Sequence, residues 1–560
     1  MIKKLLQLII ILVLIPLLAG CSVQANKALD AQNAAVILND GRGEAGNLLE
    51  EKAELEKERQ TQLGEFYVPL PPVTAEPQVK TVKARGLYIT ANVAGFEFAE
   101  DNINYYADYI RSISGQSGQP PDTSRLAEIN KLEKALAICE STEVNALVID
   151  IKNDEGLIAW KSDIAIINQI KSNGTIPFQN YTKLIDYLKK KDIYCIARVV
   201  AFKDPYLAEL KSEHTIQLKT GGVYQDRAGV KWVNPFDEYI WKYLVAISRE
   251  AALRGFDEIQ YDYVRFPDNA QYYNPVTEFP GRSGRDKDEG IEAFLEYAGQ
   301  ELEPYNVQVS ADVFGVITRS WDDKPEDIGQ TWGKITDQVD YICPMIYPSH
   351  YGPGIYGFMV PDQYPYDVAR QALMEALERN AAANKPGGIR PWYQGFTAPW
   401  IRGHIDYTAA KISDQIRAGL ELGIEEYIIW NAVNNYDPLM FFYHERVNTG
   451  IRKSGEDILA RTPETALKRY LEAEKNQRYS IRYLLTPLAS RPDDYDEFVG
   501  ELEKSQLLKN YEILTIGNNG DGTYMATIRG DYASDTGTAG IIEVQYKIFL
   551  EKDVYKVMKM

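Results

Sequence analysis

Eight short β-prone runs alternate with longer helical patterns between residues 84 and 445, and this alternation restricts the possible folds more than any other feature. Eight buried strands that alternate with helices are typical of a (β/α)8 barrel, an α/β fold. A doubly wound open sheet is the alternative, but it usually carries a Gly-rich phosphate loop after an early strand, and this sequence has none. We therefore predict a TIM barrel. Its strands are expected at Arg85–Thr90, Ala146–Lys152, Tyr194–Phe202, Glu258–Phe266, Val307–Val316, Tyr341–Tyr347, Arg390–Phe396 and Glu426–Asn431.

The alternation stops at about Thr462, where a different pattern begins. Thr462 and Pro463 are suited to the start of a helix over 463–475, and further helical patterns run to about residue 509. Three strand candidates follow, at Tyr511–Ile516, Thr523–Ile528 and Ile541–Leu550. We predict a barrel domain over 83–447 and a small α+β domain over 460–560. The pattern of the second domain faintly resembles nuclear transport factor 2-like folds.

The first residues have the pattern of a secretory signal. Lys3 and Lys4 precede an apolar run over 5–18, and Leu18-Ala19-Gly20-Cys21 follows. The run is shorter than the roughly 20 residues of a membrane span, which argues against a retained anchor helix. Leu-Ala-Gly-Cys resembles the bacterial lipobox, and the resemblance implies lipidation of Cys21. Residues 1–21 are then a lipoprotein signal, residues 22–82 are a tether, and the protein is extracytoplasmic and anchored to the bacterial membrane.

Composition excludes some partners and sites. The chain has 61 basic and 80 acidic residues among 560, a net charge of −19, which argues against a nucleic-acid partner. The four His residues are scattered, so a His-based zinc site is not expected, and there is no Gly-x-Ser-x-Gly elbow. Three Cys residues remain after Cys21, an odd number that forms no disulfide framework. We expect no cofactor.

The stretch Gly255–Pro267 predicts the end of a helix, a tight turn and a strand that carries Asp262. Asp is disfavoured inside strands and is costly to bury without a partner. Arg265 is the nearest counter-charge, so one interpretation is a structural ion pair. The other is a catalytic carboxylate at the carboxyl end of a parallel strand, where barrel enzymes keep their chemistry.

Acids, amides and aromatic residues gather at the ends of the other predicted strands. This combination fits glycoside hydrolysis, in which one acid protonates the leaving oxygen and a second attacks the anomeric carbon or activates water. The predicted catalytic residues are Asp262, Asp312 and Asp150. The predicted substrate-binding residues are Arg265, Lys152, Asp154, Tyr347, Trp392, Gln394, Trp430 and Asn431.

The acids receive separate roles. Asp262 is assigned as nucleophile or base, kept ionised by Arg265, and Asp312 as proton donor with a pKa raised by burial. Asp150 also ends a predicted strand and can exchange roles with Asp312.

Several motifs carry a resemblance to a known family. They are Ala84-Arg85-Gly86-Leu87-Tyr88, Val148-Ile149-Asp150-Ile151-Lys152, Trp232-Val233-Asn234-Pro235, Tyr261-Asp262-Tyr263-Val264-Arg265-Phe266-Pro267, Ala311-Asp312-Val313-Phe314-Gly315 and Pro344-Met345-Ile346-Tyr347-Pro348. With them, residues 84–445 resemble the putative glycoside hydrolase domain of bacterial secreted and lipid-anchored proteins. The resemblance implies a TIM barrel that cleaves glycosidic bonds.

A more distant similarity is to the family 18 chitinase-like barrels. The sequence departs from them at Val264, where their catalytic Glu would fall, so their substrate-assisted route is not implied.

The leading hypothesis is thus a cell-surface hydrolase that acts on a polysaccharide. One alternative is a catalytically inactive barrel that binds glycan. Another is a carboxylate–metal hydrolase, which loss of activity with EDTA would reveal.

Overall fold

The computed structural model describes residues 43–72, 79–118, 122–173, 177–319, 327–443, 454–533 and 540–560. The predicted signal peptide and Cys21 lie outside these residues. The chain divides after Val79 into two compact units, and each is described by itself. Along the described parts of the chain, every helix is too short or too polar to cross a membrane.

The first unit contains a helix, α3 (Gly43–Leu63), and a 3-10 turn, η1 (Gly64–Phe66). The Glu56 carboxylate accepts hydrogen bonds from the Tyr67 hydroxyl and the Leu70 backbone N–H, both at 2.8 Å. These bonds fix the chain where it leaves α3.

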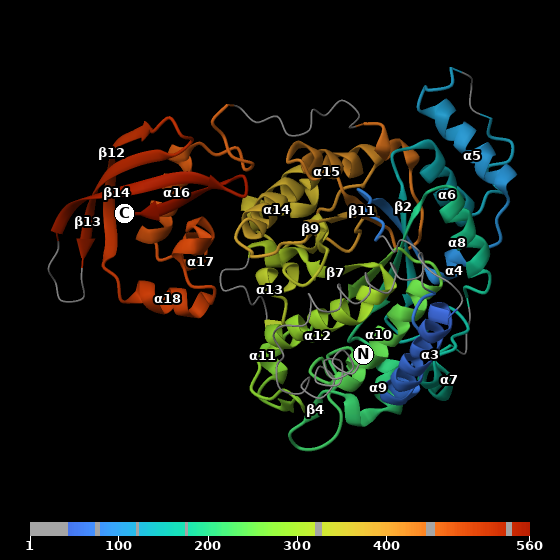
Figure 1. The fold of residues 1–560 in the computed structure, drawn as a ribbon. Coiled ribbons are helices and arrows are strands. Elements are labelled where there is room, and N and C mark those ends of the chain that lie inside the picture. The colour runs from blue at the N-terminus through green and yellow to red at the C-terminus, as the bar shows by residue number, and fades with distance from the viewer. Residues whose placement is uncertain are drawn as a thin grey trace. The chain divides into compact units, whose positions relative to one another are not determined.

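The second unit begins with a closed barrel of eight parallel strands, as predicted (Figure 1). The strands neighbour one another in chain order, and the pairing of β10 with β8 closes the circle. They are β1 (Arg85–Ile89), β2 (Ala146–Lys152), β3 (Tyr194–Val200), β5 (Glu258–Asp262), β7 (Gln308–Phe314), β8 (Tyr341–Ile346), β10 (Trp392–Gln394) and β11 (Tyr427–Trp430).

The seventh strand is interrupted, whereas the sequence predicted one run over 390–396. A short strand, β9 (Gly388–Ile389), pairs with the start of β8, and β10 pairs with its end. Pro391 lies between them and has no N–H to donate, which breaks the ladder there. The Arg390 N–H still donates to the Ile342 carbonyl at 3.0 Å, so the two pieces continue one another.

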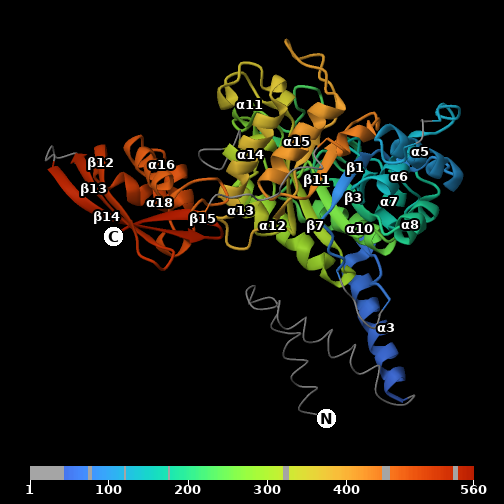
Figure 2. The same ribbon diagram turned by 90° about the horizontal axis from the view of Figure 1, so that it is seen from above.

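Helices follow the strands and surround the barrel (Figures 1 and 2). The α10 helix ends before Gly255, which has φ +100° and therefore takes the helix-ending conformation that the sequence predicted. The helices are α4 (Ala91–Ala94), α5 (Glu100–Ile113), α6 (Lys131–Ser141), α7 (Ala165–Ile170), α8 (Tyr181–Lys190), α9 (Pro205–Leu210), α10 (Glu238–Leu253), α11 (Ala270–Tyr273), α12 (Lys287–Leu302), α13 (Trp332–Thr336), α14 (Pro365–Asn380) and α15 (Ala409–Glu421). A two-stranded ribbon, β4 (Gln217–Leu218) with β6 (Thr277–Glu278), joins two of the loops.

The interior of the barrel is packed with side chains from alternate positions of its strands. A cluster of buried residues fills it: Ala84, Tyr88, Ala146, Val148, Tyr194, Ile196, Tyr341, Cys343, Tyr347, Trp392 and Ile428. At the amino ends of the strands, the fully buried guanidinium of Arg390 bonds both carboxylate oxygens of Glu258, at 2.7 and 2.8 Å. Paired charges therefore close the barrel at this end. The cavity lies at the opposite end.

A second, smaller sheet lies beyond the barrel (Figure 1). It has four antiparallel strands, β12 (Leu507–Asn518), β13 (Tyr524–Ala533), β14 (Gly540–Glu551) and β15 (Val554–Lys559). Three of them were predicted; β15 was not. The helices α16 (Pro463–Lys475), α17 (Tyr479–Leu485) and α18 (Tyr495–Glu503) precede the sheet, and α16 packs against it (Figure 2). Thr462 caps α16, as predicted, by accepting from the Thr465 N–H at 3.2 Å.

The barrel and this sheet share a junction built on α14. The buried Glu378 carboxylate bonds Arg461 at 2.7 Å and Arg469 at 2.8 Å. Beside it, Ala381 packs with Leu459 and Val554 in a small apolar cluster. The predicted boundary at 447–460 falls partly on residues outside the described ranges.

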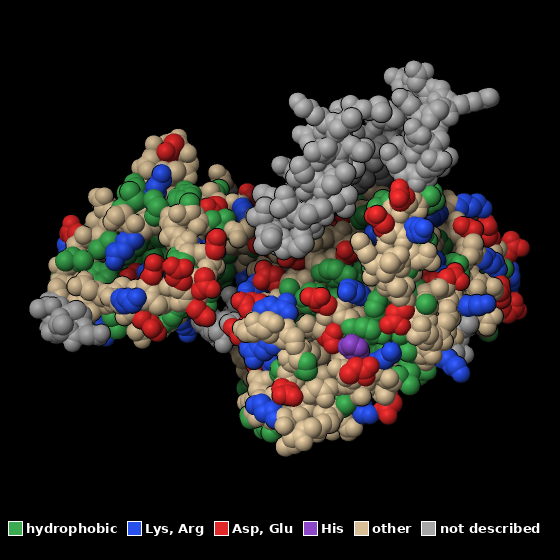
Figure 3. Space-filling model, turned by 60° about the horizontal axis from the view of Figure 1, so that its bottom comes forward, with side chains coloured by type: hydrophobic (Ala, Val, Ile, Leu, Met, Phe, Trp, Pro, Cys, Tyr) green, Lys and Arg blue, Asp and Glu red, His purple; other side chains and the backbone are tan. Residues whose placement is uncertain are grey.

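The molecular surface mixes both signs of charge. On the face drawn in Figure 3, acidic and basic side chains of the described residues are interspersed, with small hydrophobic groups between them. This is the ordinary surface of a globular protein.

Candidate active site

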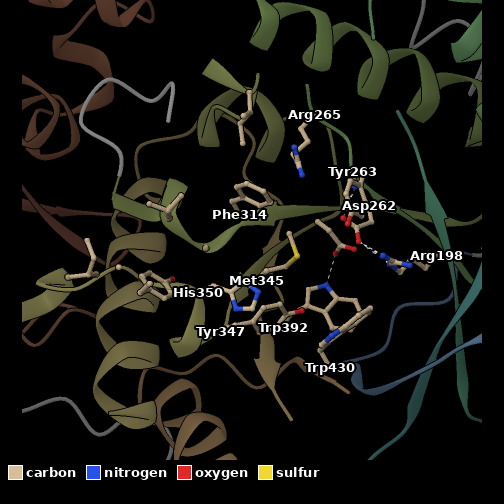
Figure 4. Close-up of a pocket in the computed structure, with 17 residues that line it drawn as sticks. Arg198, Asp262, Tyr263, Arg265, Phe314, Met345, Tyr347, His350, Trp392 and Trp430 are labelled. Carbon is tan, nitrogen blue, oxygen red and sulfur yellow. Dashed lines mark hydrogen bonds and ion pairs between the residues drawn. The ribbon is translucent and has the colours of Figure 1, made fainter. Parts of the chain in front are cut away.

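A cavity of about 580 Å³ lies at the carboxyl ends of the barrel strands. Its walls come from β3, β5, β7, β8, β10, β11 and the loops that follow them (Figure 4). Six residues predicted from the sequence line it: Asp262, Arg265, Asp312, Tyr347, Trp392 and Trp430. Barrel enzymes keep their active sites at this end, so the cavity is the candidate site.

Asp262 is the last residue of β5. Its neighbour Tyr261 pairs with Ala311 of β7, which places Asp262 beside Asp312 in the next register position. The prediction of a strand to residue 266 is wrong, because the strand ends at Asp262. Tyr263 has φ +50°, a left-handed conformation that is rare for a bulky residue and costs roughly 1–3 kcal/mol. This turn brings the Tyr263 N–H to Asp262 Oδ1 at 2.6 Å. It also places the Tyr263 side chain in the wall of the cavity.

Arg198 of β3 provides the counter-charge for Asp262. Its Nε donates to Asp262 Oδ2 at 3.0 Å, and its Nη2 contacts the same oxygen (Figure 4). Its Nη1 donates to Asp150 Oδ1 at 2.6 Å. One buried guanidinium therefore binds carboxylates from β2 and β5, the two strands that flank its own.

Arg265 does not have the role that the sequence suggested. It lines the cavity, but it forms its ion pair with Asp268 at 3.0 Å and donates to the Phe266 carbonyl at 2.8 Å. Its guanidinium lies 4.5 Å from the centre of the Phe314 ring. The left-handed turn at Tyr263 redirects the chain, so Arg265 points to the rim of the cavity.

Asp312 has a different environment from Asp262. Its Oδ1 accepts a hydrogen bond from the Trp392 indole at 2.6 Å. Its Oδ2 is buried and has no hydrogen-bond partner among the described residues. Burial raises the pKa of this carboxyl well above its usual range, and the charge of Asp262 raises it further, while Arg198 and the indole act in the opposite direction.

Asp150 lies behind the cavity wall and does not line the cavity. It accepts from Arg198 and from the Tyr88 hydroxyl, so both of its oxygens are bound. Burial raises the pKa of the Asp150 carboxyl against the opposing effects of these two partners. Its contacts fit a residue that positions Arg198.

Four predicted substrate-binding residues have internal partners instead. Lys152 is fully buried and pairs with Asp204 at 2.9 Å, and Asp154 pairs with Lys203 at 2.8 Å outside the cavity lining. The Gln394 side chain bonds the backbone of Ser349 and Phe396. The Asn431 side chain bonds the carbonyls of Gly395 and Asn435. All four hold strand ends and loops in place.

Other residues in or beside the cavity were not predicted from the sequence, and Arg198 and Tyr88 matter most among them. An Arg in the middle of the buried run 194–200 was a signal, because a charge there requires a partner. Tyr88 stacks on Trp430 with ring centres 4.0 Å apart, and Trp392 meets Trp430 edge-on at 5.6 Å. Phe314, Met345 and His350 also line the cavity.

Metal-ligating side chains do not gather here. Over the ranges that the structure describes, no three His, Cys, Asp or Glu side chains are arranged to hold an ion. Arg198 lies between Asp150 and Asp262 and bonds both carboxylates.

The family model of the "Putative glycosyl hydrolase domain" matches residues 122–436, more than half of the chain. The chain belongs to this family. Its barrel is therefore a glycosyl hydrolase domain, and the match includes Asp150, Arg198, Asp262, Asp312 and Trp392.

Solved structures also match the chain. The chain is similar to a hypothetical protein from Ruminiclostridium thermocellum (30% identity, 40% of this chain and 97% of that chain, TM-score 0.31). It is also similar to the PgaB glycoside hydrolase domain from Bordetella bronchiseptica (11%, 65% and 99%, 0.42) and a chitinase from Chromobacterium violaceum (12%, 65% and 98%, 0.33). No curated protein matches the chain.

Proposed function

We propose that this family member hydrolyses a glycosidic bond of a polysaccharide through Asp262 and Asp312. The observation that carries the proposal is the contrast between two carboxylates that are register neighbours in one cavity. Asp262 is held against a guanidinium, whereas Asp312 is buried beside an indole, and one of its oxygens has no partner among the residues that the structure describes. Glycoside hydrolysis needs such a pair, one carboxylate ionised and one protonated.

The proposed reaction assigns one step to each acid. Asp312 gives its proton to the glycosidic oxygen as the bond to the leaving sugar breaks. As that bond breaks, Asp262 either takes a proton from a water that attacks the anomeric carbon, or attacks this carbon itself. In the second case water then hydrolyses the covalent intermediate and gives a proton back to Asp312. Trp430 and Phe314 line the cavity and supply apolar aromatic surface for the sugar.

The cell-surface location is part of the same proposal. Leu18-Ala19-Gly20-Cys21 supports a lipid anchor, and residues 22–82 then serve as the tether to the membrane. A polysaccharide substrate outside the cytoplasm is consistent with this location.

A glycan-binding protein without turnover is the second candidate, and one observation favours it. Both oxygens of Asp262 are already bonded, Oδ2 by Arg198 and Oδ1 by the Tyr263 N–H. Asp262 would then be a structural partner of Arg198, and the cavity would bind sugar only.

Turnover by the wild type, and its loss in Asp262→Asn, separate the two candidates. We expect this nearly isosteric change to lower turnover by several orders of magnitude while glycan binding remains. The assay incubates residues 22–560 with defined oligomers of glucose, N-acetylglucosamine and galactosamine and measures new reducing ends. Near-native turnover by Asp262→Asn on a confirmed substrate would refute the mechanism.

Two further substitutions assign the acids and provide a control. Asp312→Asn should cost about 10²–10⁴-fold in kcat, as loss of a general acid does, and Asp150→Asn should cost less, because Asp150 acts through Arg198. Asp257→Asn is the matched control. Asp257 lies at the opposite end of β5 and accepts from the Cys195 N–H at 2.9 Å, so its loss should leave turnover unchanged.

A further inference from the structure

Trp400 is an exposed tryptophan held close to the candidate site. It lies in the loop after β10 and 66% of it is exposed to solvent. Its ring stacks on Phe396, with ring centres 6.1 Å apart and planes 20° apart. Contiguous apolar groups at the surface, of which Trp400 and Phe396 are one pair, mark binding surfaces more often than single exposed residues do.

A series of rings connects Trp400 with the cavity. Phe396 contacts Tyr347, with ring centres 6.0 Å apart, and Tyr347 is part of the cavity wall. His350 meets both rings, at 5.3 Å from Tyr347 and 6.4 Å from Phe396. Figure 4 shows Tyr347 and His350 on the side of the cavity away from Arg198. Aromatic rings in contact with one another therefore extend from the cavity wall to the exposed Trp400.

The loop that carries Trp400 is held in place by polar contacts. The Ile405 N–H donates to Asp362 Oδ2 at 3.1 Å, and the Gln363 side chain donates to the Gly403 carbonyl at 2.6 Å. The carbonyl of Phe396 accepts from Gln394, which also accepts from the Ser349 N–H. Because the loop is anchored on both sides of Trp400, the ring is presented before any ligand binds, which lowers the ordering cost of binding.

From these contacts we infer that Phe396 and Trp400 form an accessory sugar-binding surface for the same glycan chain whose bond lies over Asp262 and Asp312. The occupant is a pyranose ring outside the cavity, so the substrate is an oligosaccharide or polysaccharide of several sugars, not a disaccharide. The inference rests on the proposed function for the identity of the ligand. Continuity with the cavity through Tyr347 favours the substrate itself over a second protein.

The length of the sugar substrate is the variable that tests this inference. The probes are dimers and hexamers of glucose, N-acetylglucosamine and galactosamine, compared for kcat/KM and, in the Asp262→Asn background, for affinity by calorimetry. We expect Trp400→Ala to lower kcat/KM for a hexamer about tenfold through KM, with little change for the dimer. Tyr443→Ala is the control, because Tyr443 is 61% exposed but lies beyond η9 (Pro438–Phe441) and outside this series of rings.

The outcomes separate the inference from the proposed function. In one outcome, Trp400→Ala turns over both sugars and lowers kcat/KM equally, or not at all, for the sugar dimer and the sugar hexamer. This result refutes the accessory surface and leaves the proposed hydrolysis intact. Hexamer binding that depends on Trp400 without turnover supports the surface and refutes hydrolysis. If no hexamer binds, both the accessory surface and the proposed hydrolysis are refuted. Sedimentation measures whether the protein itself is a dimer. If the wild-type protein is a dimer and Trp400→Ala is a monomer, Trp400 binds a second copy of the chain, and this also refutes the inference.

Discussion

The Trp392 indole donates a 2.6 Å hydrogen bond to one carboxylate oxygen of Asp312 and leaves the other oxygen buried, with no partner among the described residues. The bond fixes the plane of the carboxyl group. It also stabilises the ionised form and so lowers the pKa that burial raises. The two effects together set the pH at which Asp312 can act as a proton donor.

Trp392→Phe should therefore move the pH profile. If Asp312 is the proton donor, activity is lost as the pH rises through its pKa. Removing the indole donor raises that pKa, so the alkaline limb of kcat/KM should move up by about one pH unit. Trp332→Phe is the control, because its indole bonds Asn380 at 2.8 Å away from the cavity. An alkaline limb that does not move contradicts the role of Asp312.

Arg198→Met should destabilise the barrel strongly at neutral pH. It leaves two buried carboxylates without their shared counter-charge, which typically costs about 3–5 kcal/mol in the free energy of unfolding. The deficit should shrink as the pH falls, because protonation removes the uncompensated charges. Unfolding by guanidinium chloride, the denaturant, at pH 7 and pH 5 measures both effects.

A matched surface substitution serves as the control for Arg198. Arg111 pairs with Asp108 at 2.6 Å on the surface, so Arg111→Met should change the free energy of unfolding by less than about 1 kcal/mol. A comparable loss in the two variants would show that the Arg198 pairs contribute no more than surface ion pairs.

The barrel should fold without the C-terminal sheet. A fragment from Val82 to Gly450 is expected to be soluble and to keep turnover, with a lower melting temperature because Ala381 loses the cover of Leu459 and Val554. Circular dichroism and thermal melts measure this. An insoluble fragment beside a soluble full-length protein would mean that the C-terminal residues complete the core of the barrel.

The lipid anchor is tested at its predicted site. Cys21→Ser should abolish lipid labelling and release the protein from membranes, because the thiol is the group that would be acylated. Fractionation and labelling of cells that produce the wild type and the variant give the answer. A labelled, membrane-bound Cys21→Ser protein would show that the lipobox interpretation is wrong.

Local patterns were sufficient for the barrel and insufficient for the contacts of its site. A run of apolar residues indicates a buried strand by itself, so all eight strands were predicted. Most bounds differed by two residues or fewer, and the larger differences are the break at Pro391 and the end of β5. The partner of Asp262 was misassigned because sequence proximity pointed to Arg265. The true partner, Arg198, lies on the adjacent strand, and strand register is a property of the closed barrel that no single segment contains.

The burial of Asp312 was predictable and its partner was not. An Asp inside a run of apolar residues at a strand end must be shielded from water, which the sequence shows directly. The Trp392 indole reaches it from two strands away across the barrel, at a distance set by the packing of the interior. β15 was missed for a simpler reason: its short run at the end of the chain follows β14 after only two residues.

Arg198 has a consequence for how this family can diverge. Because one guanidinium bonds both Asp150 and Asp262, neither acid can be exchanged without altering the surroundings of the other. The effects of substitutions at these three positions should be epistatic, with a second change compensating part of the first. Relatives that have replaced the arginine are thus expected to have replaced at least one of the two acids as well.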